Sequence, residues 1–220
     1  MRTSNKIKEI SSAYRELLAS SLVILVCLLL FLKFPTTNSF QNISKEIFFF
    51  LIVPIFYIKF ILKKDLRDFG FSLPRKKSDF FWAIGVLLAL IGISLILAKI
   101  PEFRKNYLIV NSLGNSFLVF LLYELVAFNF LFLLQTIFFQ GFILFTFSDK
   151  FKKYSVLLTF IIYCASLLLE NNFAWQMAPL ILFSLGGSLI SYKSRSFWLA
   201  YLTGMIFIIA FDSFLIYISK

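Results

Sequence analysis

Long apolar stretches, separated by short polar segments, run through the whole chain. The longest covers residues 117–147 and contains neither Lys nor Arg, with a single carboxylate at Glu124. Because a helix crosses a bilayer with roughly 20 apolar residues, this stretch predicts a spanning helix. Six further spans are predicted over residues 17–34, 47–62, 80–98, 155–169, 177–192 and 196–218. We therefore expect an all-α, polytopic transmembrane helix bundle of about seven spans (six to eight), forming one integral-membrane domain over residues 1–220.

The few polar residues of the longest stretch are spaced like one face of a helix. At about 100° per residue, Asn129, Thr136 and Gln140 fall within roughly 40° of one another, whereas Glu124 and Gln135 point elsewhere. Polar groups in a spanning helix face the protein interior or a wet cavity, because hydrocarbon cannot satisfy them. We expect this helix to line the bundle interior, with Asn129, Thr136, Gln140 and Gly204 as candidate cavity-lining residues; the alternative is that these groups only hydrogen-bond helices together.

Composition and charge agree with a membrane protein. Hydrophobic residues make up 60% of the chain and the mean hydropathy is +0.88, whereas soluble domains are about half apolar. The net charge is +11, but the basic residues lie in short segments between spans, which is the pattern of cytoplasmic loops rather than of nucleic-acid binding. We expect a lipid bilayer as the surroundings, a cytoplasmic amino terminus and no nucleic-acid partner. The predicted inner segments then hold 16 of the 22 basic residues: Arg2, Lys6, Lys8, Arg15, Lys59, Lys63, Lys64, Arg67, Arg75, Lys76, Lys77, Lys150, Lys152, Lys153, Lys193 and Arg195.

Most common catalytic constellations are absent from the chain. It has no histidine, which excludes Ser-His-Asp and Cys-His units and His-ligated metals. Its two cysteines, Cys27 and Cys164, lie in apolar spans and cannot form a four-ligand metal site, so we expect neither a metal nor a cofactor. The carboxylates inside the predicted spans are Glu124 and Asp212. Intramembrane acids are functional candidates by default; the alternative is a neutral, hydrogen-bonded acid.

The segment QTIFFQGFILF, residues 135–145, resembles the first motif of the CPBP family of intramembrane proteases, which includes Rce1-like CAAX prenyl endopeptidases and the bacteriocin-processing Abi proteins. That motif is Glu-Glu-x-x-x-Arg followed by Gly-Phe. The spacing places Gln135 and Thr136 at the two glutamates and Gln140 at the arginine. The upstream segment LRDFGFSLP, residues 66–74, is similar to a loop that precedes the third span in this family.

Two later segments are similar to the histidine motifs of the same family. YCASL places Leu167 at the first histidine, and KSRSFWLAYLTGMIFI places Gly204 at the second histidine and Ile208 at a later polar position. The resemblance covers about residues 66–214. Measured from the predicted cytoplasmic helix ends at about 1.5 Å per residue, Thr136, Leu167 and Gly204 lie at similar depths of roughly 12–16 Å.

The resemblance implies a helical fold built for glutamate-assisted peptide hydrolysis, yet no family position in this chain holds a proton acceptor. We expect a catalytically inactive CPBP-like membrane protein, a pseudoenzyme, in the bacterial inner membrane. It would bind a peptide or a membrane-protein partner in the former active-site cavity. Two alternatives stay open: an active endopeptidase with altered residues, using Glu124 or Asp212, and an unrelated polytopic transport-accessory or immunity protein.

Overall fold

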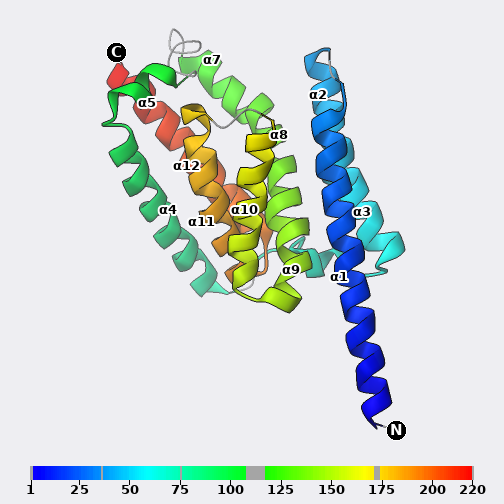
Figure 1. The fold of residues 1–220 in the computed structure, drawn as a ribbon. Coiled ribbons are helices and arrows are strands. Elements are labelled where there is room, and N and C mark those ends of the chain that lie inside the picture. Colours follow the sequence, from blue (N-terminus) through cyan, green and yellow to red (C-terminus); the bar gives the residue numbers. More distant parts are fainter. Residues whose placement is uncertain (1, 36, 75, 108–116, 171–173, 220) are drawn as a thin grey trace.

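The computed structural model describes residues 2–35, 37–74, 76–107, 117–170 and 174–219. Every secondary-structure element in these residues is helical (Figure 1). The α-helices are α1 (Arg2–Lys33), α2 (Ser39–Glu46), α3 (Val53–Phe56), α4 (Lys77–Leu97), α5 (Pro101–Asn106), α7 (Phe117–Leu122), α8 (Asn129–Thr136), α9 (Leu144–Phe151), α10 (Tyr154–Leu169), α11 (Ala178–Ser194) and α12 (Phe197–Ser219). Between them lie the π-helical turns η1 (Ile47–Ile52), η2 (Tyr57–Ile61), η4 (Tyr123–Phe128) and η5 (Ile137–Ile143), and the 3₁₀ turns η3 (Leu66–Phe69) and η6 (Trp175–Met177).

Four of the described helices are long and apolar enough to cross a bilayer. They are Tyr14–Lys33, Lys77–Leu97, Leu118–Phe151 and Phe197–Ile218, and they correspond to predicted spans 17–34, 80–98, 117–147 and 196–218. Tyr154–Leu169 is apolar but shorter. The all-helical class is therefore confirmed for the described residues, and the four apolar helices indicate a bilayer environment. The total of seven spans stays a prediction.

The helix that contains the second predicted span, 47–62, begins before the apolar run, at Ser39. Residues 35–46 are polar and predict a loop, but the chain turns helical at Ser39, where the Asn38 side chain accepts a hydrogen bond from the Gln41 N–H at 2.9 Å. An N-cap of this kind satisfies a free backbone donor, which lets a polar segment start a helix. The helix continues through α3 to η2, with π-helical turns on both sides of Pro54, whose missing N–H removes one bond from the helical ladder.

The longest predicted span is one continuous helix of 34 residues, Leu118–Phe151. It contains two π-helical turns, η4 and η5, and Gln140 lies inside the second. A π turn accommodates extra residues and so changes which side chains share a face. Thr136 and Gln140, on either side of the start of η5, are buried and line the same small gap, whereas Asn129, at the far end of the regular helix α8, is half-buried.

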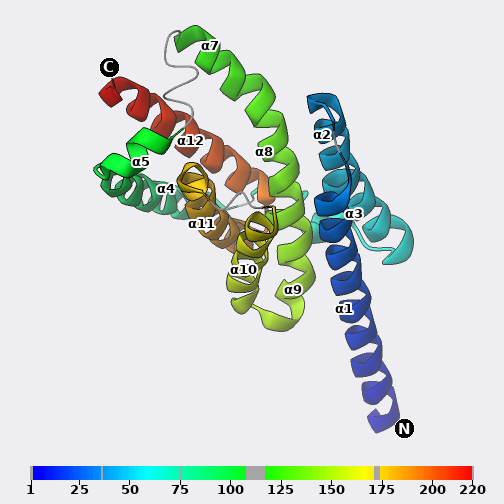
Figure 2. The ribbon, with the colours of Figure 1, turned by 45° about the horizontal axis from the view of Figure 1, so that its top comes forward.

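The long helix lies between two groups of helices (Figures 1 and 2). On one side stands the hairpin of α1 with α2–α3, and on the other lie α10, α11, α12 and α4. Phe138 and Phe142 of η5 pack into a core shared with the hairpin, where Phe138 stacks on Phe50 with ring centroids 4.6 Å apart. A second core joins α4, α11 and α12 around Phe183 and Phe207.

The segment between η2 and α4 folds under the end of the bundle. Gly70 has a φ of +84°, and a Cβ there would lie 2.4 Å from the Phe145 ring, so glycine fits both the conformation and the space. Its carbonyl accepts a hydrogen bond from the Phe197 N–H at 3.1 Å, which ties this segment to the start of α12.

The charge pattern predicts that Asn42 and Lys152, both exposed, lie on opposite sides of the membrane. Single cysteines at these positions, in a background lacking Cys27 and Cys164, should react with an impermeant maleimide from the outside only at position 42. Labelling both positions after the membrane is permeabilised provides the control. Equal labelling of both in intact cells would contradict the orientation.

Candidate functional site

The level of the bundle where the family resemblance predicts a catalytic cavity is nearly filled. Thr136 and Gln140 face a cavity of only about 10 Å³, which Phe132, Phe183 and other side chains close. A space of this size is at the lower limit for one water molecule. The Thr136 hydroxyl donates to the Phe132 carbonyl at 2.8 Å, within its own helix. The wet cavity expected around these residues is therefore reduced to a small gap.

Gly204 explains how this level closes. A Cβ built on Gly204 would lie 2.5 Å from atoms of both the Phe132 and the Phe183 ring. The two rings, with centroids 5.0 Å apart, thus occupy the space that a histidine would need. The structure brings Thr136, Gln140 and Gly204 together around these rings, and Ile208 is buried in the same core.

A larger cavity, of about 300 Å³, lies beside this level, where α1, η1 and the end of α2 face the long helix, α10 and the start of α11. Gln135 lines both this cavity and the small gap beside Thr136 and Gln140, whereas Leu167 lines the larger cavity. Its remaining lining is largely aromatic and aliphatic, with Tyr163 and the carboxyl-bearing residues Glu46 and Glu170. Mostly apolar walls with a few polar groups are typical of ligand sites.

Glu46 is a carboxyl-bearing residue at the edge of this cavity. It ends α2, just outside the predicted span 47–62, and its Oε2 atom is buried without a hydrogen-bond partner. Burial, reinforced by the negative charge of Glu170, raises the pKa of Glu46 from its ordinary 4.5 to about 7. Near neutral pH this carboxyl therefore exists in both protonation states.

The two intramembrane acids, Glu124 and Asp212, lie together and away from both spaces. Both are fully buried, and their carboxyl groups are within hydrogen-bonding reach of each other. Neither Glu124 oxygen has a donor, whereas Asp212 accepts a 2.6 Å hydrogen bond from the Tyr107 hydroxyl. One proton shared between the carboxyls would satisfy both, since two adjacent carboxylates cannot both stay ionised in an apolar site. Burial beside Asp212 raises the pKa of Tyr107 well above its ordinary value, so its hydroxyl remains a donor.

Asn129 belongs to neither space. Its side-chain oxygen accepts a hydrogen bond from the Tyr201 hydroxyl of α12, and its amide donates to the Leu125 carbonyl at 3.1 Å. This polar contact joins the long helix to α12, as the alternative reading of the polar stripe predicts. Among the described residues, no group of three or more His, Cys, Asp or Glu side chains could hold a metal ion.

Comparison of the chain with protein-family models, with curated proteins and with solved structures finds no match. The family resemblance therefore rests on the motifs quoted above.

Sequence reasoning missed Glu46, Glu170 and Tyr107 as candidate site residues. The first two stand in segments that hydropathy assigns to loops, and Tyr107 lies in a predicted loop whose residues 108–116 are outside the described residues. Only the tertiary fold brings Tyr107 to Asp212, 105 positions away. A carboxyl directly at the end of an apolar run was the one available signal for Glu46 and Glu170.

Alanine substitutions at two glycines test whether the space around Gly204 is filled by the Phe132 and Phe183 rings. Gly204→Ala should destabilise the protein by about 1–3 kcal/mol, because the new methyl group meets the Phe132 and Phe183 rings. Gly92→Ala, at a helical glycine with no atom within 4 Å of a built Cβ, should instead stabilise it by roughly 0.5–1 kcal/mol. Reversible unfolding in bicelles measures both. Equal effects at the two sites would mean that Gly204 faces open space.

The acid pair has its own test. Asp212→Ala should destabilise the protein by about 2–4 kcal/mol, because it leaves the Tyr107 hydroxyl and the Glu124 carboxyl buried without a partner. Asp212→Asn should cost less than about 1 kcal/mol, since its oxygen can accept from Tyr107 and its amide can donate to Glu124. The same unfolding assay compares them, and an equal loss in both variants would contradict the hydrogen-bonded arrangement.

Proposed function

We propose that the chain is a catalytically inactive, CPBP-like integral membrane protein that holds a segment of a membrane-embedded partner in the 300 Å³ cavity. One observation supports this proposal. Phe132 and Phe183 close the level that holds Thr136 and Gln140, and an open cavity beside that level is lined by Gln135 and Leu167.

The chemistry of the family positions supports a non-catalytic role. Peptide hydrolysis of this type needs a group that takes a proton from water near neutral pH. The amides of Gln135 and Gln140 and the hydroxyl of Thr136 do not do so, and the chain has no histidine. Glu124 and Asp212 lie within hydrogen-bonding reach of each other and line neither space.

The shape of the larger cavity supports binding of a short apolar segment. Its volume is at the lower end of the range of ligand pockets, which is about 300–1,000 Å³, and holds a few side chains or part of an acyl chain. Because it lies between the hairpin and the long helix, an occupant reaches it from within the bilayer. Gln135 and the Tyr163 hydroxyl supply polar groups that can hydrogen-bond a peptide carbonyl or N–H.

Photo-crosslinking tests this proposal in the native membrane. A photoreactive amino acid at Leu131, which lines the cavity, should yield a discrete adduct, whereas one at Val126, which is 66% exposed on the same helix, should yield only lipid or diffuse products. Filling the cavity with Ser166→Phe should remove the adduct, and Leu168→Phe on the outer face of α10 should leave it unchanged. An adduct that survives Ser166→Phe would contradict binding in this cavity.

One observation favours an altered active site as a second candidate. Glu46 and Glu170 both line the cavity, and a carboxyl with a pKa of about 7 is suited to general acid–base work. We expect no cleavage of candidate membrane peptides by the reconstituted protein, followed by mass. Cleavage by the wild type that Glu46→Gln abolishes, with folding intact, would replace the inactive reading by a carboxylate-dependent endopeptidase.

The raised pKa also predicts a pH dependence of stability. Because the folded pKa of Glu46 exceeds the unfolded one, the stabilisation is complete below about pH 4.5 and is lost as the pH rises through about 7. Relative to Glu46→Gln, the wild type should therefore lose about 1 kcal/mol between pH 5 and pH 8, allowing for partial solvent screening. The exposed acid variant Glu102→Gln is the control, and a flat difference for Glu46→Gln would show that the carboxyl is not buried.

A further inference from the structure

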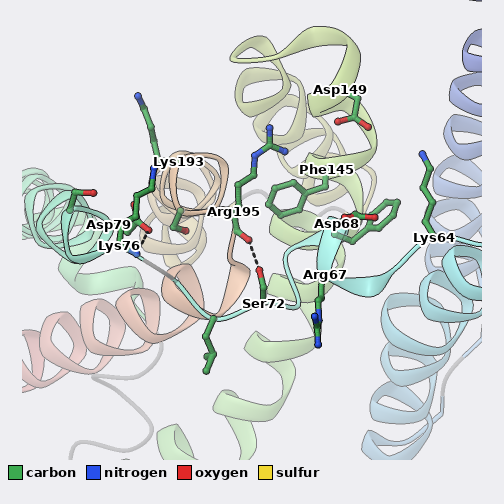
Figure 3. Close-up of a pocket in the computed structure, with 14 residues that line it drawn as sticks. Lys64, Arg67, Asp68, Ser72, Lys76, Asp79, Phe145, Asp149, Lys193 and Arg195 are labelled. Atoms are coloured by element: carbon green, nitrogen blue, oxygen red, sulfur yellow. Dashed lines mark hydrogen bonds between the residues drawn. The ribbon is translucent and has the colours of Figure 1, made fainter.

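A second, larger pocket opens at the basic end of the bundle and is independent of the intramembrane cavity. Its volume is about 650 Å³, and its walls come from the segment before α4, the end of α9 and the turn between α11 and α12 (Figure 3). Two hydrogen bonds fix these walls to one another: the Gly70 carbonyl accepts from the Phe197 N–H at 3.1 Å, and the Ser72 hydroxyl donates to the Arg195 carbonyl at 3.1 Å. The pocket is therefore a built feature of the fold.

The charges around this pocket are divided between its two sides (Figure 3). Lys193 and Arg195 lie on one side of the Phe145 ring, with Lys76 and Asp79 beside Lys193. Asp68 and Asp149 lie on the other side, with Arg67 near Asp68. Lys64 stands beside the two acids, but Glu16 neutralises it in the one ion pair found between described side chains. The first side therefore has a net positive charge and the second a net negative charge, and Lys193, Arg195, Asp68 and Asp149 are exposed and not paired with one another.

The pocket lies at the level of lipid headgroups. Spans Lys77–Leu97 and Phe197–Ile218 begin beside it, and span Leu118–Phe151 ends there. The Lys193 ammonium lies 5.6 Å from the ring of Trp82, and tryptophan is enriched at the membrane–water interface. A ligand in this pocket can therefore keep its acyl chains in the bilayer.

We infer that this pocket binds the headgroup of an aminophospholipid, in which a phosphate and a primary ammonium are joined, as in phosphatidylethanolamine. Lys193 and Arg195 would hold the phosphate, for which ammonium and guanidinium groups are the usual partners. Asp68 and Asp149 would accept hydrogen bonds from the ammonium. A purely anionic headgroup would offer no cation to Asp68 and Asp149, and a choline headgroup has no N–H to donate to them.

Native mass spectrometry of the full-length protein, with equal amounts of phosphatidylethanolamine, phosphatidylcholine and phosphatidylglycerol, measures this preference. We expect retention of the ethanolamine lipid about threefold above the other two, which is the size of an exposed ion pair. Equal retention of all three lipids, or highest retention of the glycerol lipid, would overturn the inference.

Variants separate the two sides of the pocket. Arg195→Gln should weaken both the ethanolamine and the glycerol lipid, whereas Asp149→Asn should weaken the ethanolamine lipid and strengthen the glycerol lipid. Lys152→Gln, an exposed residue of the adjacent turn outside the pocket lining, is the matched control and should change neither. Thermal unfolding shows that each variant is folded, and an unchanged lipid ratio in folded Asp149→Asn would overturn the assignment of the ammonium.

A soluble competitor distinguishes the lipid from a free metabolite of the same chemistry. Glycerophosphoethanolamine, which carries the phosphate and the amine without acyl chains, should not displace the bound lipid at equal concentration. Displacement by this compound at equal concentration would overturn the lipid assignment and would indicate a soluble phosphate–amine ligand instead.

Discussion

The burial of residues 136–145 of the long helix is the constraint on which the rest of the structure depends. Every residue from Thr136 to Phe145 is buried, by the hairpin on one side and by α10, α11 and α12 on the other. Inside a bilayer, lipid tails are as apolar as leucine, so burial alone does not drive helices together; close packing and interhelical hydrogen bonds do. The stacked rings of Phe50 and Phe138 and the Asn129–Tyr201 contact are instances of each.

Close packing also decides which sites the molecule has. Gly204 lets Phe132 and Phe183 approach, and their rings close the level at which the family resemblance predicts hydrolysis. The hairpin packs less completely against the long helix, which leaves the 300 Å³ cavity on that side. The buried acids and the charged pocket lie at the two ends of the bundle: the Glu124–Asp212 pair is at one end, and the pocket around Arg195 is at the other.

Hydropathy predicted the helical class, the membrane and the central position of residues 117–147, because these follow from one-dimensional patterns. The pairing of Asp212 with Tyr107, and the contribution of Glu46 to a cavity, could not be read this way, because both depend on residues that meet only in the folded chain. The predicted polar stripe holds for Thr136 and Gln140, which line one gap, whereas Asn129 bonds Tyr201 of α12 instead, a contact that only the tertiary fold provides. The polar segment 35–46 was misread because an Asn38 cap, invisible to hydropathy, starts a helix at Ser39.

The level at which the family resemblance predicts hydrolysis is packed shut, while the neighbouring cavity is open. A cryo-electron microscopy map of the protein in lipid nanodiscs, with an antibody fragment bound for alignment, tests it most directly. The account predicts density for the Phe132 and Phe183 rings seated against Gly204, no ordered water between Thr136 and Gln140, and lipid or peptide density beside Gln135 and Leu167. A water-filled cavity in which Gln140 and Gly204 line the same open space would contradict it.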